Sequence, residues 1–386
     1  MSAALVFWLC IGLTAYAYAG YPLLAAALAR WIGRDPAASA HEPMAEDCWP
    51  SLTVVVAARN EEQRIAGRVR DILRQDYPGD RIRVHVVDDG STDATALAAA
   101  IGDVRVCVQS LPRHLGKAAA LNAAMADRDE MGGGLVVFTD ARQRFAPGAL
   151  RHLVAPFADA SVGAVSGELV IQREGAGAGA EGLGLYWRME KALRFHEARL
   201  GWLHGVSGAI HAIRPALFQP LPPGTVLDDM WLPLHVRLRG HRVWMARRAL
   251  ALDTPSADVR EEFARKLRTL AGNWQLLARM PVLMHPLRNP VFLSWFSHKF
   301  LRLLVPWALL VALAASAVAG GALYRSLFAL QVLGYLWAAI GLRLPALAAR
   351  VPLLPAAGTF LMLNLAALLA LPAFVAWQPS QLWKRH

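Results

Sequence analysis

Cysteine is scarce in this chain, with 3 copies among 386 residues. Cys10, Cys48 and Cys107 are odd in number and share no spacing typical of a metal site. The pattern argues against a cysteine-based metal centre and predicts free thiols in a reducing compartment.

Acidic residues are also few: 29 Asp and Glu stand against 40 Lys and Arg, which gives a formal net charge of +11. No nucleic-acid-binding motif accompanies this charge, so we expect no nucleic acid partner. We attribute the surplus to a membrane surface of anionic lipid and to an anionic ligand, because both attract basic residues.

Polar residues are rare at the two ends of the chain. The hydrophobic content is 55% and the mean hydropathy is +0.33, which is high for a soluble protein. The apolar residues gather at both ends, while polar, patterned sequence lies between about Trp49 and Arg288. This distribution predicts a soluble domain held between membrane segments.

The first apolar segment runs from about Ala3 to Ala29 without a charged residue, long enough for a helix to cross a bilayer core of about 30 Å. Arg30 and Arg34 follow it and no Lys or Arg precedes it, so the positive-inside rule places Met1 outside and the next domain in the cytoplasm. A cleaved signal peptide is the alternative, because residues 15–17 (AYA) resemble a cleavage site. The missing basic n-region and the length of the run argue against it.

Three further apolar stretches of near-spanning length lie toward the C-terminus, at 303–323, 326–342 and about 353–377. Arginines punctuate them, and prolines indicate kinks or helix starts. We predict four transmembrane helices, one of which alternatively lies in the membrane interface. The punctuating residues are Arg325, Arg343, Arg350, Pro306, Pro345, Pro352, Pro355 and Pro372.

Between the two ends, strand and helix patterns alternate. Apolar runs predict strands at 51–57, 83–87, 104–108 and 135–138, and helical spacing predicts helices at 65–75 and 117–126, with an alanine-rich helix before the third strand. This alternation means a doubly wound α/β domain with a parallel sheet. Ligands of such sheets bind at the carboxyl ends of the strands, where the polar clusters of this sequence also fall.

Three of these clusters suggest ligand chemistry. Asp88-Asp89 offer acceptors for a base N–H or a ribose hydroxyl, although residues 91–93 would also make the segment an ordinary turn and helix cap. Gly116-Lys117 open a helix and offer phosphate donors, or else Lys117 is a solvated surface lysine. Asp140 ends an apolar strand and is suited to a divalent ion bound to a diphosphate.

Seven segments occur together in an order and spacing that resemble the family 2 glycosyltransferases, over about Leu52 to Arg279. These enzymes are inverting and have a doubly wound, GT-A-like core, and the whole chain is similar to their membrane-bound bacterial branch related to polysaccharide synthases, including an SHKFLR segment before the last helices. The seven segments are VVVAARNE, VVDDGSTD, LGKAAALN, VFTDARQ, GVSGAIHAIR, LDDMWLPLHVRLRGHRV and RKLRTLAGNWQ.

The resemblance implies a set of residues for a nucleotide-sugar donor, expected to be UDP-linked. Asp140 takes the first position of the family's Asp-x-Asp motif, near ribose and metal, and Arg142 stands where the second Asp is expected. Mg²⁺ or Mn²⁺ held by Asp140 and the diphosphate is therefore expected, with a fixed positive charge from Arg142 as the alternative. Nucleotide contacts are implied for Ala57 and Glu61, base recognition for Asp89, and diphosphate contacts for Arg113, Lys117 and Arg268.

The resemblance also implies the catalytic residue. Asp229 takes the place of the general base and Asp228 that of the glutamate before it. A sugar hydroxyl is a poor nucleophile, and removal of its proton during attack on C1 lowers the barrier. Carboxylates are also favoured at the start of a helix over 230–238, and both interpretations hold together.

Two segments concern the acceptor and diphosphate side. Residues 265–269 align with the Gln-x-x-Arg-Trp motif of processive synthases, with Arg265 in place of Gln and Thr269 in place of Trp. Gly208 lies in a segment similar to the acceptor loop, where small residues let a ligand approach the backbone. Because Thr269 has no ring to stack on a sugar, we favour the addition of one or a few sugars over processive synthesis.

Two mixed aromatic and basic segments suggest contact with the membrane surface. Residues 185–200 suit a helix in the lipid interface, with packing in the core as the alternative, and 295–302 are similar. Residues 175–180 predict a flexible loop.

The sequence thus predicts a membrane-embedded glycosyltransferase of the bacterial inner membrane with a cytoplasmic catalytic domain and a lipid-linked or glycan acceptor. A processive polysaccharide synthase and a non-catalytic nucleotide-sugar-binding subunit are the alternatives. The expected divisions are a transmembrane helix at 1–30, a linker at 31–48, the catalytic domain at 49–290, an interfacial segment at 291–302, transmembrane helices at 303–378 and a tail at 379–386.

Overall fold

The computed structural model describes residues 1–36, 49–126, 134–171, 179–254, 259–348 and 350–376. Most of the expected linker at 31–48 and of the expected loop at 175–180, and all of the expected tail, lie outside these residues. The chain divides into two compact units, which are described separately. The α/β unit comprises Arg34–Gln172 and Gly201–Pro255, and the helical unit comprises Met1–Gly33, Arg173–Leu200 and Ser256–Trp377.

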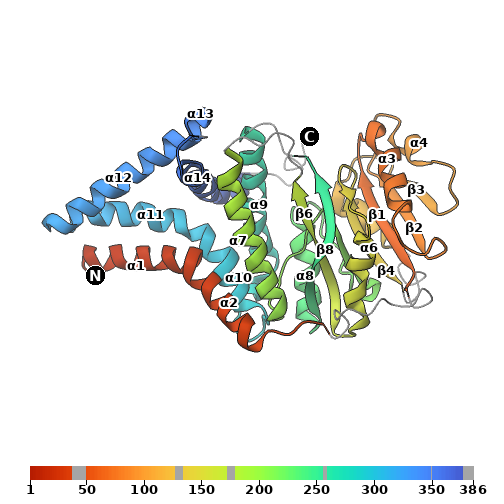
Figure 1. Cartoon of the computed structure of the whole chain (residues 1–386), viewed down its shortest axis with the longest axis horizontal. Coiled ribbons are helices and arrows are strands. Elements are labelled where there is room, and N and C mark those ends of the chain that lie inside the picture. Colours follow the sequence, from red (N-terminus) through yellow and green to blue (C-terminus); the bar gives the residue numbers. More distant parts are fainter. Residues whose placement is uncertain (37–48, 127–133, 172–178, 255–258, 349, 377–386) are drawn as a thin grey trace. The chain divides into compact units, whose positions relative to one another are not determined.

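An eight-stranded sheet organises the α/β unit, with the order β3-β2-β1-β4-β7-β6-β8-β5 (Figure 1). The first four strands in this order are parallel, as the sequence predicts, whereas β7 runs antiparallel to both of its neighbours. The strands are β1 (Leu52–Ala58), β2 (Ile82–Asp88), β3 (Val106–Ser110), β4 (Leu135–Asp140), β5 (Arg144–Phe145), β6 (Val162–Ile171), β7 (His211–Ile213) and β8 (Arg242–Asp253).

The register of the parallel strands brings three predicted positions together. Ala57 of β1 pairs with Asp140 of β4, and Ala58 of β1 pairs with Asp88 of β2. The buried β-branched run Val54, Val55 and Val56 makes β1 a central strand with apolar packing on both faces. The polar residues that end these strands therefore share one edge of the sheet.

Short helices cover the sheet and carry further polar residues to that edge. Helices α3, α4 and α5 pack against the parallel strands, and α6 and α8 pack against β6 and β8. Lys117 and Asp228 are the first residues of α5 and α8, so each begins a helix beside the sheet. The helices of this unit are α3 (Glu62–Leu73), α4 (Thr95–Ala99), α5 (Lys117–Ala124), α6 (Ala149–Val154) and α8 (Asp228–Leu238), with 3₁₀ turns at Ala155–Ala158 and Pro215–Leu217.

Four helices of the helical unit are long and apolar enough to cross a membrane, in agreement with the predicted number: Ala3–Ile32, Phe292–Val318, Gly321–Arg343 and Leu354–Ala376. Residues 291–302, expected as a separate interfacial segment, are nearly all part of the second of these helices. That helix ends at Val318 rather than near 323, because Gly320 and Gly321 take φ angles of 72° and 79° that break the helix.

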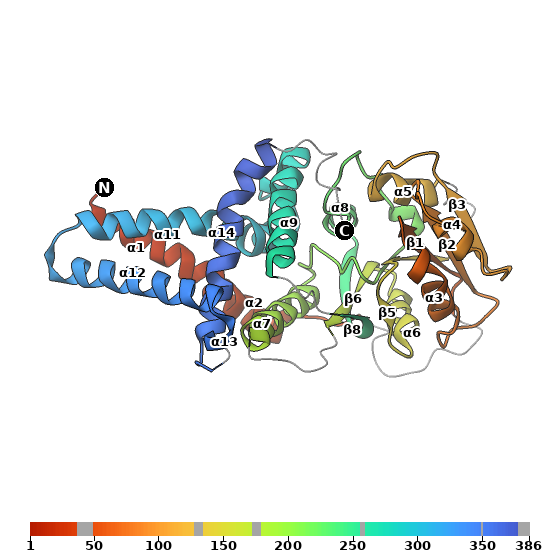
Figure 2. The same ribbon diagram turned by 90° about the horizontal axis from the view of Figure 1, so that it is seen from above.

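The helical unit contains shorter and interrupted elements as well (Figure 2). Helices α7 and α9 belong to this unit although they fall within the 49–290 range expected for the catalytic domain. The elements are α1 (Ala3–Ala15), α2 (Tyr21–Ile32), α7 (Gly179–Arg199), α9 (Val259–Arg279), α10 (Phe292–Trp295), α11 (Leu301–Val318), α12 (Gly321–Arg343), α13 (Pro345–Ala348) and α14 (Leu354–Ala376), with π-helical turns at Tyr16–Gly20 and Phe296–Phe300 and a 3₁₀ turn at Pro281–Met284.

Helix α7 packs within the helical unit, against α2 and α14. Its Leu193 is 3% exposed and packs in a cluster with Tyr21 and Ala25 of α2. Leu193 is therefore packed in the core, which is the alternative to an interfacial helix that the sequence left open for residues 185–200.

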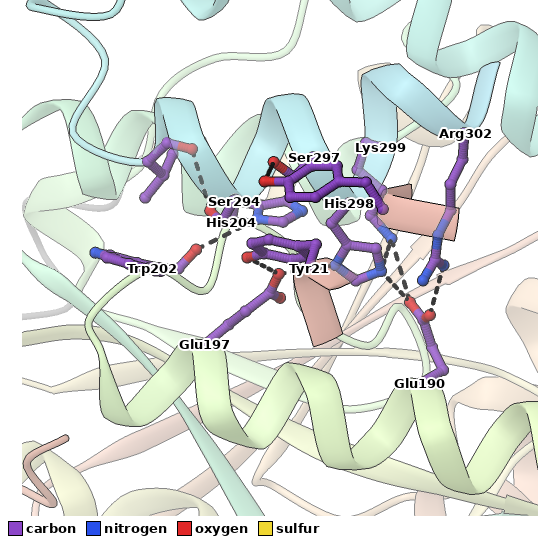
Figure 3. A network of polar contacts seen from close by, with 12 residues as sticks. Tyr21, Glu190, Glu197, Trp202, His204, Ser294, Ser297, His298, Lys299 and Arg302 are labelled. Atoms are coloured by element: carbon purple, nitrogen blue, oxygen red, sulfur yellow. Dashed lines mark hydrogen bonds and ion pairs between the residues drawn. The ribbon is translucent and has the colours of Figure 1, made fainter. Parts of the chain in front are cut away.

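A network of buried and partly buried polar contacts joins three segments of this unit (Figure 3). Glu197 of α7 accepts a hydrogen bond from the hydroxyl of Tyr21 at 2.8 Å, and its Oε1 lies 2.9 Å from Nδ1 of His298. Nε2 of the same histidine lies 2.7 Å from Glu190, which also accepts a hydrogen bond from Arg302 at 2.9 Å. The N-terminal helix, α7 and the helix that begins at Phe292 are thus joined by polar contacts as well as by apolar packing.

Candidate active site

The candidate site begins with a lysine held between two carboxylates. Nζ of Lys117 lies 3.0 Å from Oδ1 of Asp140 and 3.1 Å from Oδ2 of Asp228. Burial alone would lower the pKa of Lys117, but the two carboxylates outweigh it and raise that pKa above its ordinary value. Burial would likewise raise the pKa of Asp140, yet Lys117, Arg142 and His211 lower it. Lys117 and Asp140 therefore carry full charges at neutral pH.

These residues come from three separate elements. Lys117 opens α5, Asp140 ends β4 and Asp228 opens α8. At the start of α8 the helix dipole favours a carboxylate, and the ammonium of Lys117 adds to that effect. The fold thus brings the predicted diphosphate, metal and acceptor-side residues to one point.

Asp229 lies beside the predicted acceptor loop. Its backbone carbonyl accepts a hydrogen bond from the N–H of Val206 at 2.8 Å. A Cβ built on Gly208 would lie 3.9 Å from Oδ2 of Asp229, so a glycine leaves the carboxylate accessible from the loop. Asp229 is partly exposed, as a residue that meets an incoming molecule has to be. The structure therefore places Asp229 and Gly208 side by side.

Asp89 is buried and its carboxylate holds a loop. It accepts hydrogen bonds from the backbone N–H groups of Leu115 at 2.7 Å and Gly116 at 2.9 Å, and Nδ1 of His114 lies 2.7 Å away. Gly90, with φ of 61°, lets the backbone of this loop approach, since a Cβ there would come within 2.3 Å of the Arg113 carbonyl carbon. Asp89 thereby fixes the segment that leads into Lys117.

The remaining predicted donor residues surround this edge of the sheet. Ala57 is the cross-strand neighbour of Asp140, and Arg113 is exposed on the loop after β3. Glu61 precedes α3, and its carboxylate lies 3.1 Å from Arg64 of the same helix. Asp88 accepts a hydrogen bond from the backbone N–H of Ser91, which agrees with the turn and cap interpretation of this motif.

Arg142, at the second position of the Asp-x-Asp motif, has a partner that sequence analysis missed. Its guanidinium lies 3.3 Å from Oδ2 of Asp253 at the end of β8. The same oxygen accepts a hydrogen bond from Nε2 of Gln143 at 3.0 Å. Arg142 is about half exposed and acts on the pKa of Asp140 by its charge. Because residues 142 and 253 are far apart in sequence, no local pattern signals this pair.

His211 was also missed, although it lies within a segment singled out for its small residues. It is 2% exposed, and its Nδ1 lies 2.9 Å from the carbonyl oxygen of Ser207. Burial lowers the pKa of His211 to about 4, against the opposing effect of the Asp228 and Asp140 charges. Its Nε2 is buried and has no hydrogen-bond partner in the described part of the chain. The sequence signal that could have pointed to His211 is a polar histidine in a short apolar segment that becomes the buried strand β7.

Arg265 and Arg268 lie on α9, in the helical unit. Arg265 is 3.4 Å from Glu262 of the same helix, and its carbonyl accepts a hydrogen bond from the hydroxyl of Thr269 at 2.9 Å.

Two carboxylates of the α/β unit offer the oxygen ligands that a divalent cation takes. Asp140 and Asp228 supply carboxylate oxygens, and the buried Nε2 of His211 is an acceptor atom without a hydrogen-bond donor among the residues described. Oxygen ligands from carboxylates suit Mg²⁺ and Mn²⁺, and imidazole nitrogen is accepted by Mn²⁺.

A parallel half-sheet with a charged cluster at its carboxyl edge defines a nucleotide-binding α/β protein of GT-A type. The family model described as glycosyl transferase family 2 matches residues 53–220. The N-acetylglucosaminyltransferase of Rhizobium leguminosarum bv. trifolii is 32% identical over 142 residues, which cover 35% of this chain and 76% of that protein. The chain belongs to glycosyl transferase family 2.

Two other proteins extend the comparison. The beta-monoglucosyldiacylglycerol synthase of Synechocystis sp. is 32% identical over 154 residues, or 37% of this chain and 32% of that protein. The chain spans about a third of the length of this and other curated relatives. Mannosyltransferase PcManGT from Pyrobaculum calidifontis, solved in complex with GDP-Man and Mn²⁺, is similar in structure with a TM-score of 0.68 and 25% identity, over 96% of this chain and 99% of that chain.

Proposed function

We propose that this chain is an inverting glycosyltransferase that moves a sugar from a nucleoside-diphosphate donor to a membrane-linked or glycan acceptor. The observation that carries the proposal is the cluster of Lys117, Asp140 and Asp228 beside Asp229 at the carboxyl edge of the sheet. The ammonium of Lys117 can bind diphosphate oxygens once a divalent ion offsets the two carboxylates, and a partly exposed carboxylate beside a glycine loop suits an acceptor.

In this proposal the donor lies along the edge of the parallel strands. Lys117 binds the diphosphate with positive charge, and Arg113 adds to it from the neighbouring loop, while a diphosphate contact of Arg268 stays a prediction from the sequence. Ala57 and Glu61 contact the nucleoside. Asp89 contributes by holding the backbone of residues 115 and 116, which sets the position of Lys117. Gly208 lies on the acceptor side, and a role of Arg265 on the diphosphate side stays a prediction from the sequence.

Asp229 is the proposed general base. Its carboxylate takes the proton of the acceptor hydroxyl as that oxygen forms a bond to C1 of the donor sugar. The bond from C1 to the diphosphate breaks on the opposite face, so the configuration at C1 inverts and the nucleoside diphosphate leaves. Lys117 stabilises the negative charge that grows on the leaving oxygens.

Asp140 and Asp228 are the proposed carboxylate ligands of a divalent ion, Mg²⁺ or Mn²⁺. When bound, such an ion would supply positive charge to the leaving diphosphate. The presence of Mn²⁺ with GDP-Man in the similar mannosyltransferase supports this assignment. That neighbour also makes a guanosine donor a candidate beside the uridine donor expected from sequence.

We further propose that the chain resides in the bacterial inner membrane with the α/β unit in the cytoplasm. The four long apolar helices support the membrane assignment. A lipid-linked acceptor agrees with the membrane assignment. The name of one relative, beta-monoglucosyldiacylglycerol synthase, is that of an enzyme that makes a glycolipid. A processive synthase is the second candidate, and the absence of an aromatic ring at Thr269 speaks against it.

The test is a screen of the purified full chain for donor hydrolysis and transfer against UDP- and GDP-linked sugars, with lipid extract as acceptor. We expect turnover of one donor class and products extended by one or a few sugars. Long chains formed while most acceptor remains unextended would identify a processive synthase. Tight donor binding without any turnover would identify a binding subunit instead.

A further inference from the structure

Arg68 is a buried arginine on the face of α3 that packs against the sheet. It is 3% exposed, and Ile65, Val69 and Ile72 of the same helix are buried with it. Burial lowers the pKa of Arg68 to about 10, so the guanidinium still carries its charge at neutral pH. A buried charge lowers stability relative to a well-packed apolar side chain, so the contacts of Arg68 indicate what it holds in place.

Two neighbours fix the orientation of this guanidinium. Its Nη1 donates to Oδ2 of Asp71, and the same oxygen accepts a hydrogen bond from the backbone N–H of Phe145 at 3.0 Å. The guanidinium carbon lies 3.9 Å from the centre of the Phe145 ring. In this orientation Nη2 donates to Oγ1 of Thr139 at 2.7 Å.

The hydroxyl of Thr139 continues the chain of hydrogen bonds to the acceptor loop (residues 205–210). An arginine can only donate, so Oγ1 accepts from Arg68 and gives its own proton to the carbonyl oxygen of Ala209, 2.6 Å away. The backbone pairing of β4 with β7 ends one residue before Thr139. Beyond that point, the side-chain hydroxyl joins the end of β4 to the loop.

This hydrogen bond lies between the donor and acceptor sides of the candidate site. Thr139 directly precedes Asp140, which contacts Lys117. Ala209 directly follows Gly208, where an added Cβ would lie 3.9 Å from Oδ2 of Asp229. The chain from Arg68 therefore connects the strand end that carries Asp140 with the loop beside the proposed base.

We propose that Arg68 is a positioning residue for sugar transfer, which holds the acceptor loop at the end of β4 through the hydroxyl of Thr139. The inference rests on the proposed function. Attack on C1 requires the acceptor hydroxyl, the base and the donor in one arrangement, and a displacement of about 1 Å lowers the rate on the order of 10²-fold. Loss of this contact should therefore lower turnover and leave donor affinity unchanged.

The first variant is Thr139→Val, which has nearly the same shape and no hydroxyl. Turnover by the full chain in detergent should fall about ten- to hundredfold, with donor affinity by calorimetry unchanged. Hydrogen exchange measured by mass spectrometry should become faster in residues 205–210, because the loop has lost its bond to β4. Thr139→Ser keeps a hydroxyl and should restore both properties.

The second variant is Arg68→Met combined with Asp71→Asn, so that no carboxylate is left without its cation. It should show the same loss of turnover and the same faster exchange in residues 205–210. Adding Thr139→Val to this variant should lower turnover little further, because residues that act in one chain of contacts are not additive. Additive losses would show that Arg68 does not act through Thr139 and would overturn the inference.

The matched control is Tyr77→Phe. Tyr77 is 6% exposed, and its hydroxyl also donates to a backbone carbonyl at 2.6 Å, that of Pro50. Pro50 lies before the start of β1, at the opposite edge of the sheet from the candidate site. This variant should lower the melting temperature as Thr139→Val does, while turnover and exchange in residues 205–210 stay as in the natural chain.

Two outcomes separate this inference from the proposed function. Natural turnover in Thr139→Val, or unchanged exchange in residues 205–210, would overturn the inference and leave the proposed function intact. A natural chain that binds donor but transfers no sugar would refute the proposed function. The exchange measurement would then still decide whether Arg68 and Thr139 hold the loop.

Discussion

At the scale of single residues, the site separates two neighbouring aspartates by their surroundings. Asp228 is 7% exposed and contacts Lys117, whereas Asp229 is partly exposed beside Gly208. A carboxylate that must take a proton has to be reachable by the acceptor, and one that binds a cation has to be held in place. The two side chains thus suit different tasks although they are adjacent in the chain.

The variant Asp229→Asn should keep donor binding and lose transfer, because an amide cannot take the acceptor proton. A loss of about 10²–10⁴-fold in turnover is expected for a missing general base. Turnover and donor affinity, measured by product formation and calorimetry, test this together. Asp228→Asn is the comparison and should weaken donor binding, since it releases Lys117. Near-normal turnover in Asp229→Asn would assign the base to another residue.

The stability that the contact between Lys117 and Asp140 contributes should fall as the pH is lowered. Because Lys117 lowers the pKa of Asp140 in the folded state, the contact stabilises the fold above the ordinary carboxyl pKa of about 4 and is lost as pH falls through the lowered value. The raised pKa of Lys117 keeps the ammonium charged through neutral pH.

We therefore expect Lys117→Met to melt at a lower temperature than the natural chain at pH 7, because two carboxylates are left without their cation. The difference should shrink in acid, where the carboxylates of the variant take up protons. Melting curves across this range test the prediction. A difference that is constant with pH would show that the lysine contributes through packing rather than through charge.

At the scale of elements, the helical unit depends on a histidine placed between two glutamates. His298 is buried and its two nitrogens face Glu197 and Glu190, which belong to one helix, α7 (Figure 3). Each ring nitrogen lies within hydrogen-bond distance of one carboxylate, at 2.9 Å from Glu197 and 2.7 Å from Glu190. The contact fixes α7 to the helix that begins at Phe292.

His298→Leu should destabilise this unit by about 3–5 kcal/mol, the usual cost of removing one partner from a buried ionic contact. Tyr16→Phe is the matched control, since it removes a neutral hydrogen bond to Ser297 of 2.9 Å from the same region and should cost about 0.5–1.5 kcal/mol. Thermal or denaturant unfolding in detergent measures both. Equal effects of the two variants would contradict an ionic contribution.

At the scale of the whole molecule, the prediction concerns orientation in the membrane. A reporter inserted between Arg34 and Trp49 should be cytoplasmic, and so should one placed near Arg279, because the arginines after the first apolar helix remain inside. Reporter activity in intact cells is the measurement. An external signal from either site would separate the α/β unit from a cytoplasmic donor and refute the proposed function.

The sequence by itself determined the strands and helices of the parallel half of the sheet and the four long apolar helices. These features depend on local patterns: β-branched runs at 51–57 and 135–138, helical spacing, and the length of uncharged segments. Strands β5, β6, β7 and β8 were not predicted; β7 and β5, with three and two residues, are too short for a pattern.

Only the tertiary structure decided which side chains meet. Lys117, Asp140 and Asp228 come from three elements. Arg142 pairs with Asp253, the last residue of β8. Asp89 supports a loop because it accepts a hydrogen bond from the backbone N–H of Leu115, which is distant in sequence. The contact of His211 Nδ1 with the Ser207 carbonyl depends likewise on how the local fold turns that carbonyl. Hydrogen bonds and ion pairs act over a few ångströms, and distances of that size between remote residues are set by strand order and register.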